Sequence, residues 1–119
     1  MKTKTYKKFT DQELYLLLQQ KDKAAFAQLY DQYHCIIYGL AVKAVRSKEF
    51  ADEVTELTFL NVWKSLHLFQ NQQKTFCVWM VCILINTAKE FLESKNIKFI
   101  LNTENFPVFT FEFYEEKVC

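Results

Sequence analysis

The sequence predicts an all-α protein, a bundle of about four helices followed by a C-terminal β-hairpin or single strand. Gly39 and Pro107 are the only glycine and proline among 119 residues, which removes most glycine turns and leaves long helices. Apolar side chains recur at three- and four-residue steps between residues 10 and 95, whereas residues 108–114 alternate with period two. Because 50% of the residues are apolar and 24% are charged, we expect one soluble domain.

The first two helices are predicted from their caps and apolar stripes. Thr10 lies three residues before Glu13, the arrangement of a capping box, so a first helix should begin there. Asp22 is the expected cap of a second, longer helix. Its apolar stripe, which we expect to be core, consists of Phe26, Leu29, Tyr30, Tyr33, Ile37, Leu40 and Ala44.

Two further helices follow. Ser47 is the expected cap of a third helix with a broad apolar surface and acids in its first half, which suit the positive end of the helix dipole. The apolar residues are Val54, Leu57, Phe59, Leu60, Trp63 and Leu66, and the acids are Glu49, Asp52, Glu53 and Glu56. Thr75 is the expected cap of a fourth helix from about residue 76 to 95, apolar on nearly every side at its start and therefore central.

The C-terminal segment has the pattern of strands. Phe109, Phe111 and Phe113 would share one face of a strand over residues 108–114. Residues 98–101 form a second candidate strand, with a turn at residues 102–105. An isolated hairpin is marginally stable in water, so this one should pack on the helices or on a second copy of the chain.

Composition narrows the function. The net charge is +1 and Arg46 is the single arginine, so nucleic-acid binding would need a local patch, for which Lys43, Arg46 and Lys48 are one candidate.

The four cysteines have no paired spacing, so we expect no metal site and buried free thiols in a reducing cytoplasm. Residues 76–85, the longest apolar stretch, are too short to span a membrane. No catalytic constellation is evident, and we expect neither enzymatic activity nor a cofactor.

Three blocks lie in order between about residues 11 and 94. They read Asp22-x-x-Ala25-Phe26-x-x-Leu29-Tyr30-x-x-Tyr33, then Ala51-Asp52-Glu53-Val54 with Thr58-Phe59-Leu60-x-Val62-Trp63, then Phe76-x-x-Trp79-Met80-x-x-Ile83-x-x-Asn86. Their order and spacing resemble region two of the extracytoplasmic-function sigma factors, small members of the sigma-70 family of bacterial transcription initiation factors. The resemblance implies a non-enzymatic helical domain that docks on the clamp helices of core RNA polymerase through its third helix. It also implies that the fourth helix and the preceding loop engage promoter DNA.

The resemblance assigns polymerase contact to four residues of the third helix. Glu53 and Glu56 would act by charge, and Leu60 and Trp63 chiefly as support. The block departs from the family, which usually reads acid-Asp-Val-x-Gln-Glu where this chain reads Asp52-Glu53-Val54-Thr55-Glu56-Leu57. A solvated acidic first turn is the alternative interpretation of the two acids.

The residues expected to bind DNA are Lys74, Thr75, Trp79, Asn86 and Lys89. The alternative roles are a core position for Trp79 and a local turn cap for Asn86. Where the family usually has arginines on its fourth helix this chain has Cys82 and Ile85, and Glu90 and Glu93 interrupt the basic run. Because phosphate contacts carry much of the affinity for nucleic acid, we expect weakened promoter binding.

The predicted organisation is a basic N-terminal arm over residues 1–9, a region-two-like helical domain over residues 10–96, and an aromatic tail over residues 97–119. The tail has three open roles. It could lie on the fourth helix and cover the face that would otherwise meet DNA, it could be an ordinary edge hairpin, or it could pair with a second copy across a two-fold axis. The predicted function is a cytoplasmic sigma-factor-like initiation protein that contacts core RNA polymerase. The alternative is a degenerate sigma-like interaction module, a dimer, decoy or regulator, that does not bind DNA.

Overall fold

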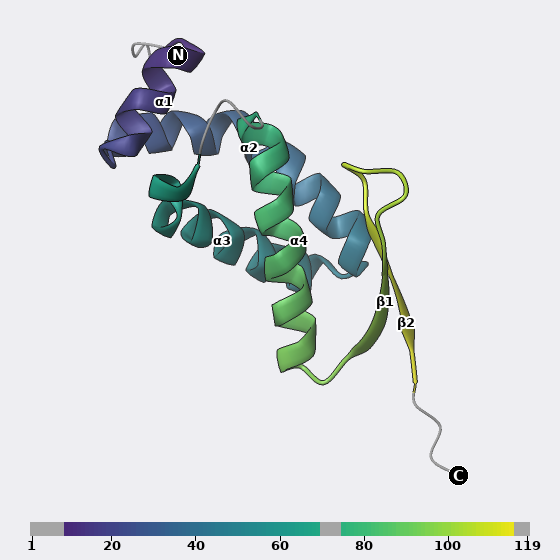
Figure 1. Cartoon of the computed structure of the whole chain (residues 1–119). Helices are drawn as coiled ribbons and strands as arrows, with labels where there is room; N and C mark the ends of the chain where they lie inside the picture. The colour runs from purple at the N-terminus through teal and green to yellow at the C-terminus, as the bar shows by residue number, and fades with distance from the viewer. Residues whose placement is uncertain (1–8, 70–74, 116–119) are drawn as a thin grey trace, which may run out of the picture.

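The computed structural model describes residues 9–69 and 75–115 (Figure 1). Within these residues four α-helices and a short 3-10 helix precede a two-stranded antiparallel sheet, which confirms the predicted fold class. The helices are α1 (Asp11–Gln19), α2 (Lys23–Val45), α3 (Lys48–Lys64), η1 (Leu66–Leu68) and α4 (Phe76–Ser94). The strands are β1 (Lys98–Asn102) and β2 (Thr110–Tyr114).

All four predicted helix caps are formed. Thr10 Oγ1 accepts a hydrogen bond from the Glu13 amide at 3.2 Å, and the Glu13 carboxylate accepts one from the Thr10 amide at 3.0 Å, which completes the capping box of α1. Asp22 caps α2, Ser47 caps α3 and Thr75 caps α4 in the same way, each accepting from the amide three residues later. These bonds satisfy amides that have no partner inside a helix, so the helix starts are fixed locally.

The core lies where α2, α3 and α4 meet, with α1 packed on α2. Fully buried aliphatic side chains from each helix fill it. Among them are Leu18, Leu29, Ile37, Val54, Val62, Met80, Leu84 and Leu92. Two polar contacts hold the N-terminal end: the Gln28 side chain exchanges hydrogen bonds with the backbone of Phe9, and Gln19 Nε2 donates to the carbonyl of Leu66 at 2.9 Å.

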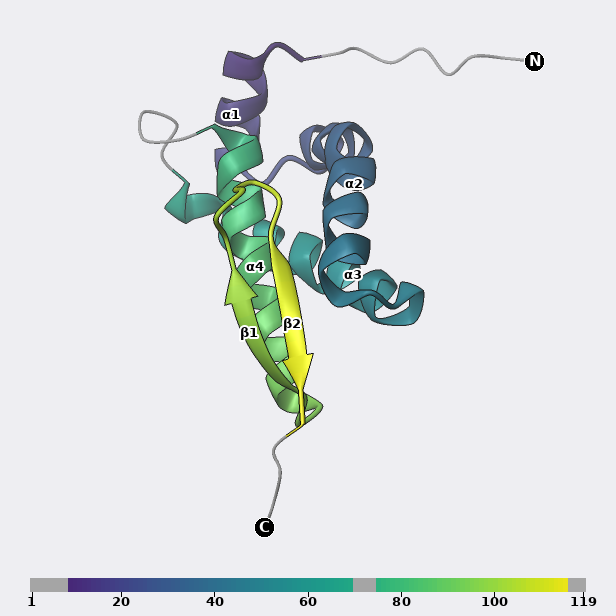
Figure 2. The ribbon, with the colours of Figure 1, turned by 90° about the vertical axis from the view of Figure 1, so that its right-hand side faces the viewer.

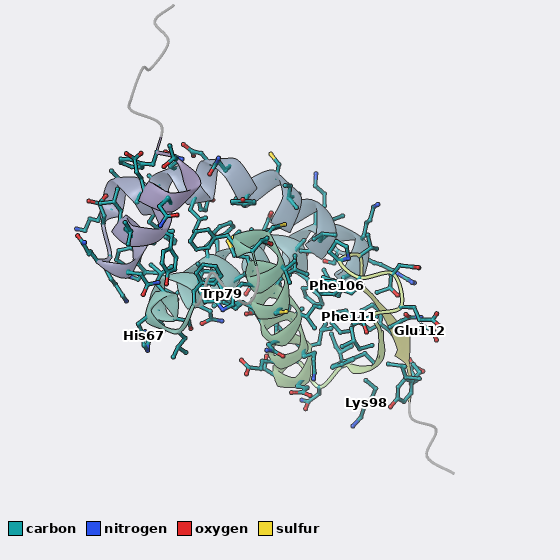
Figure 3. The ribbon with its side chains drawn as sticks, turned by 45° about the horizontal axis from the view of Figure 1, so that its top comes forward. His67, Trp79, Lys98, Phe106, Phe111 and Glu112 are labelled. Atoms are coloured by element: carbon teal, nitrogen blue, oxygen red, sulfur yellow. The ribbon has the colours of Figure 1, made fainter. Side chains whose placement is uncertain are left out.

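The predicted C-terminal hairpin is formed and belongs to the same core. β1 and β2 pair without interruption from Lys98 opposite Tyr114 to Asn102 opposite Thr110. Figure 1 and Figure 2 show the hairpin alongside α4, with β2 on the side toward α2. Phe111 lies on the face toward the helices, whereas Glu112 lies on the outer side (Figure 3). Phe109 and Phe111 are buried, as their shared face predicts, while Phe113 on that face stays 38% exposed.

Two expectations about burial were wrong. Tyr30 was expected in the core but is 37% exposed, because it lines an open groove between α2 and α3. Cys35 was expected to be buried and is exposed, since it lies beside the exposed Ile36 on the solvent side of α2. Cys77 and Cys82 are half-buried, and Cys119 lies outside the described residues.

No described helix combines the length and the apolar character that crossing a membrane requires. Within the same ranges, histidine, cysteine and carboxylate side chains nowhere gather in a group that could bind a metal ion.

Candidate protein-docking groove

An open groove of about 720 Å³ runs between α2 and α3. The two helices pack on each other along the core, and part of their apolar and aromatic surface stays uncovered on the groove side. The lining residues are Lys23, Phe26 and Tyr30 from α2, and Glu53, Glu56, Leu57, Phe59, Leu60 and Trp63 from α3.

Interlocked aromatic rings form the floor of the groove. The rings of Phe26 and Trp63 meet edge to face with centroids 5.0 Å apart, and the ring of Phe26 also lies 6.5 Å from that of Phe59. The ring centroids of Tyr30 and Phe59 lie 4.7 Å apart. The Nζ of Lys21 lies 5.1 Å from the centroid of the Trp63 ring, a cation–π contact that covers the end of the indole. These contacts fix the shape of the floor before any partner binds.

Three large apolar side chains of the groove are exposed. Leu60 is 47% exposed, Leu57 is 39% exposed and Tyr30 is 37% exposed. All three line the same groove, so the exposed apolar atoms are contiguous. Contiguous apolar patches with a polar rim are typical of protein interaction sites.

The rim of the groove is acidic on the α3 side. Glu53 and Glu56 are exposed and three residues apart, so they lie one helical turn from each other. In the part of the chain that the structure describes, neither carboxylate forms an ion pair, and both are available to a cationic partner. Lys23 stands on the α2 side. The groove therefore suits an apolar segment that carries basic side chains along one edge.

The structure brings together all four residues that the sequence proposed for polymerase contact. Glu53, Glu56, Leu60 and Trp63 line this one groove. The sequence reasoning missed the α2 wall, because Phe26 and Tyr30 continue a core stripe at helical spacing. The stripe itself was the available signal, but periodicity does not show where a neighbouring helix stops covering it.

The residues proposed for DNA contact lie on α4 and at its start, apart from Lys74, which lies outside the described residues. The Thr75 hydroxyl accepts the cap hydrogen bond from the Val78 amide at 3.2 Å. Trp79 is half-buried with its ring 5.0 Å from that of Phe69, on the side of α4 toward η1 (Figure 3). Asn86 is exposed and Lys89 is half-buried. Steps of seven and three residues put Trp79, Asn86 and Lys89 along one side of α4.

That side of α4 carries little positive charge. Glu90 and Glu93 are exposed there beside Lys89. Lys95, at the end of the helix, lies over the rings of Phe91 and Phe50 at 5.2 and 6.0 Å from their centroids. Asn86 remains exposed, so the hairpin does not cover this position. This side of α4 therefore presents a polar surface of mixed charge.

The chain is thus a helical body that carries an acid-edged apolar groove between α2 and α3. Residues 29–97, more than half of the chain, match the family described as Sigma-70 region 2. The chain belongs to this sigma-70 region 2 family, as the three sequence blocks predicted. The match ends at residue 97, directly before β1, so the hairpin follows the family segment.

Relatives include the ECF RNA polymerase sigma-E factor of Haemophilus influenzae and the RNA polymerase sigma-H factor of Pseudomonas aeruginosa. The first is 34% identical over 86 residues, which cover 72% of this chain and 44% of the relative. The second is 34% identical over 85 residues, 71% of this chain and 44% of the relative. The ECF sigma factor SigK of Mycobacterium bovis is 30% identical over 60 residues, 50% of this chain and 32% of the relative. The chain thus spans less than half the length of these relatives.

A solved structure has the same fold. It is the NMR structure of an engineered region 2 of sigmaE in complex with GTAAAA, with a TM-score of 0.66 and 27% sequence identity. The likeness covers 77% of this chain and 95% of the other.

Proposed function

We propose that this chain is a sigma-factor-like transcription initiation protein that binds core RNA polymerase through the α2–α3 groove and binds promoter DNA weakly. Family membership supports the first part, since the relatives are RNA polymerase sigma factors. The observation that carries the proposal is the groove itself. Four side chains selected from the sequence, Glu53, Glu56, Leu60 and Trp63, line one open site with an apolar floor.

The groove explains how a polymerase helix would be recognised. Apolar side chains of the partner would cover Leu57, Leu60 and the aromatic floor, which supplies most of the binding free energy. Basic side chains of the partner would pair with Glu53 and Glu56, each exposed pair contributing about 0.2–1 kcal/mol and helping to set the orientation.

The test is capture of purified bacterial core RNA polymerase by the tagged chain. Reversing both groove acids, Glu53→Lys with Glu56→Lys, should abolish capture, because the partner's cations would then be repelled. Both side chains are exposed, so the helical circular dichroism should not change. Glu90→Lys with Glu93→Lys is the matched control, since it has the same spacing and charge change on α4, and it should retain capture. Equal recovery of both double variants would contradict the docking site.

The second part of the proposal concerns DNA. Trp79, Asn86 and Lys89 line one side of α4 and could contact a single strand, with Lys74 and Thr75 before them. Stacking of a base on a tryptophan contributes about 1–3 kcal/mol. Glu90 and Glu93 are exposed next to these residues and would repel the phosphates.

The same acids favour a second candidate function, a sigma-like interaction module that occupies polymerase or another protein without binding DNA. A salt titration of single-stranded DNA binding separates the two. In the initiation-factor case the wild-type chain binds at low salt, and Glu90→Gln with Glu93→Gln binds more tightly. If neither chain binds while polymerase capture persists, the module without DNA binding is correct.

A further inference from the structure

One edge of the C-terminal hairpin is open. Within the described residues the sheet has two strands, and β2 lies on the side toward α2 (Figure 2). β1 is therefore the outer strand. Backbone groups along a strand point alternately to either side, so β1 presents amides and carbonyls on the side away from β2. Such an edge is a template for another strand.

β1 has few of the features that usually protect an edge. Its pairing with β2 is continuous from Lys98 to Asn102, so the strand carries no bulge that would twist the edge away. It contains no proline, and its one charged residue stands at the first position. The three central residues, Phe99, Ile100 and Leu101, are all large and apolar. Ile100, at the centre, is 58% exposed.

We propose that the β1 edge binds the β1 edge of a second copy of this chain, which joins the two hairpins into a four-stranded antiparallel sheet across a two-fold axis at Ile100. The pattern of β1 supports a second copy as the partner, because it runs polar, apolar, apolar, apolar, polar and reads alike from both ends. Antiparallel pairing of two such strands places each polar residue opposite a polar one and each apolar residue opposite an apolar one.

The register that follows avoids repulsion. Centring the pair on Ile100 sets Lys98 of each chain opposite Asn102 of the other, so the two lysines do not face each other. Phe99 meets Leu101 of the second copy on the face toward the helices, and the two Ile100 side chains meet on the outer face. A two-fold axis perpendicular to the sheet keeps both helical bodies on one side of it. In each chain, β2 lies between the two-fold axis and α2.

The first experiment measures the mass of the full chain in solution by light scattering over a range of concentrations. The wild-type chain should approach twice its mass of 14.3 kDa as concentration rises. Ile100→Lys should raise the dimer dissociation constant by at least about tenfold, since it places two cations at the axis. Ile36→Lys is the matched control, because Ile36 is 46% exposed on α2, and this variant should dimerise like the wild type. A wild-type chain that stays monomeric at every concentration overturns the proposal.

The second experiment identifies the interface without a variant. A dimer assembled from isotope-labelled and unlabelled wild-type chains should show nuclear Overhauser effects between Phe99 of one chain and Leu101 of the other. A dimer in which these interchain contacts are missing, or an Ile100→Lys chain that is folded by circular dichroism and still dimerises, also overturns the proposal.

Discussion

Among the described residues, three that are not glycine lie at the ends of helices in a left-handed conformation. Lys21 follows α1 with a φ of 59°, Arg46 caps α2 with a φ of 58°, and Asn96 follows α4 with a φ of 59°. Glycine is the usual residue at such positions because it has no Cβ to clash. The chain instead has its one glycine, Gly39, inside α2, where the backbone is helical. The scarcity of glycine correctly predicted long helices, but it did not show that these helices would end without glycine.

Gly39→Ala should stabilise the protein. A Cβ at this position would have no heavy atom within 4 Å outside its own helix neighbourhood, so alanine fits without strain. Alanine in a helix interior is favoured over glycine by about 1 kcal/mol, mostly because the unfolded chain loses freedom. Urea unfolding followed by circular dichroism should show a higher midpoint with an unchanged slope. An unchanged or lower midpoint would contradict this prediction.

At the scale of elements, the start of α4 combines a structural role with a proposed functional one. Thr75 caps the helix, and it is also among the residues proposed to contact DNA. Farther along, Asn61 Nδ2 donates to Thr87 Oγ1 at 2.9 Å and ties α3 to α4. The position of α4 relative to the groove helix therefore depends on packing and on this polar link.

Substitutions at Thr75 should separate the two roles. Thr75→Ala removes the cap and should lower the free energy of unfolding by about 0.5–2 kcal/mol. Thr75→Asp keeps a cap and suits the helix dipole, so stability should be close to wild type. Its negative charge should nevertheless weaken single-stranded DNA binding if the residue faces phosphate. DNA affinity that is the same for Thr75→Asp and the wild type would limit Thr75 to its structural role.

At the scale of the whole molecule, the hairpin and the helices share one hydrophobic core. Phe109 and Phe111 are 1% and 0% exposed, and they belong to the same buried cluster as the helix residues. The predicted division between residues 96 and 97 marks a change of pattern along the chain. Because the buried cluster crosses that division, we expect both segments to unfold together.

Phe111→Ala should destabilise the whole protein. Loss of a fully buried phenylalanine costs about 3–5 kcal/mol, and the cavity would lie between the sheet and the helices. Phe113→Ala is the control from the same strand face, and its effect should be clearly smaller because Phe113 is 38% exposed. Thermal unfolding should be recorded by circular dichroism for helix loss and by tryptophan fluorescence. Two outcomes would contradict a shared core. The unfolding temperature could fall for Phe113→Ala and not for Phe111→Ala, or the loss of helix in Phe111→Ala could occur at the wild-type temperature.

Much of the fold and half of the site could be predicted from the sequence. The caps at Thr10, Asp22, Ser47 and Thr75 were predictable because each bond joins residues three apart in the chain. The α3 wall of the groove was predictable because Glu53, Glu56 and Leu60 follow one another at helical spacing in a block that resembles the family, although the block departs from the family at Glu56. The hairpin was predictable from the period-two alternation of residues 108–114 and from their strand-forming side chains.

Helix starts, strand alternation and family membership were determined by the sequence itself, since they depend on near neighbours and on residue order. The tertiary structure alone decided three features. Tyr30 became part of an open groove, Phe111 entered the core of the helices, and β2 rather than β1 came to lie against α2. Each depends on which side of an element its neighbour covers. A periodic stripe shows that an apolar face exists, but burial is set by contacts between residues far apart in the chain.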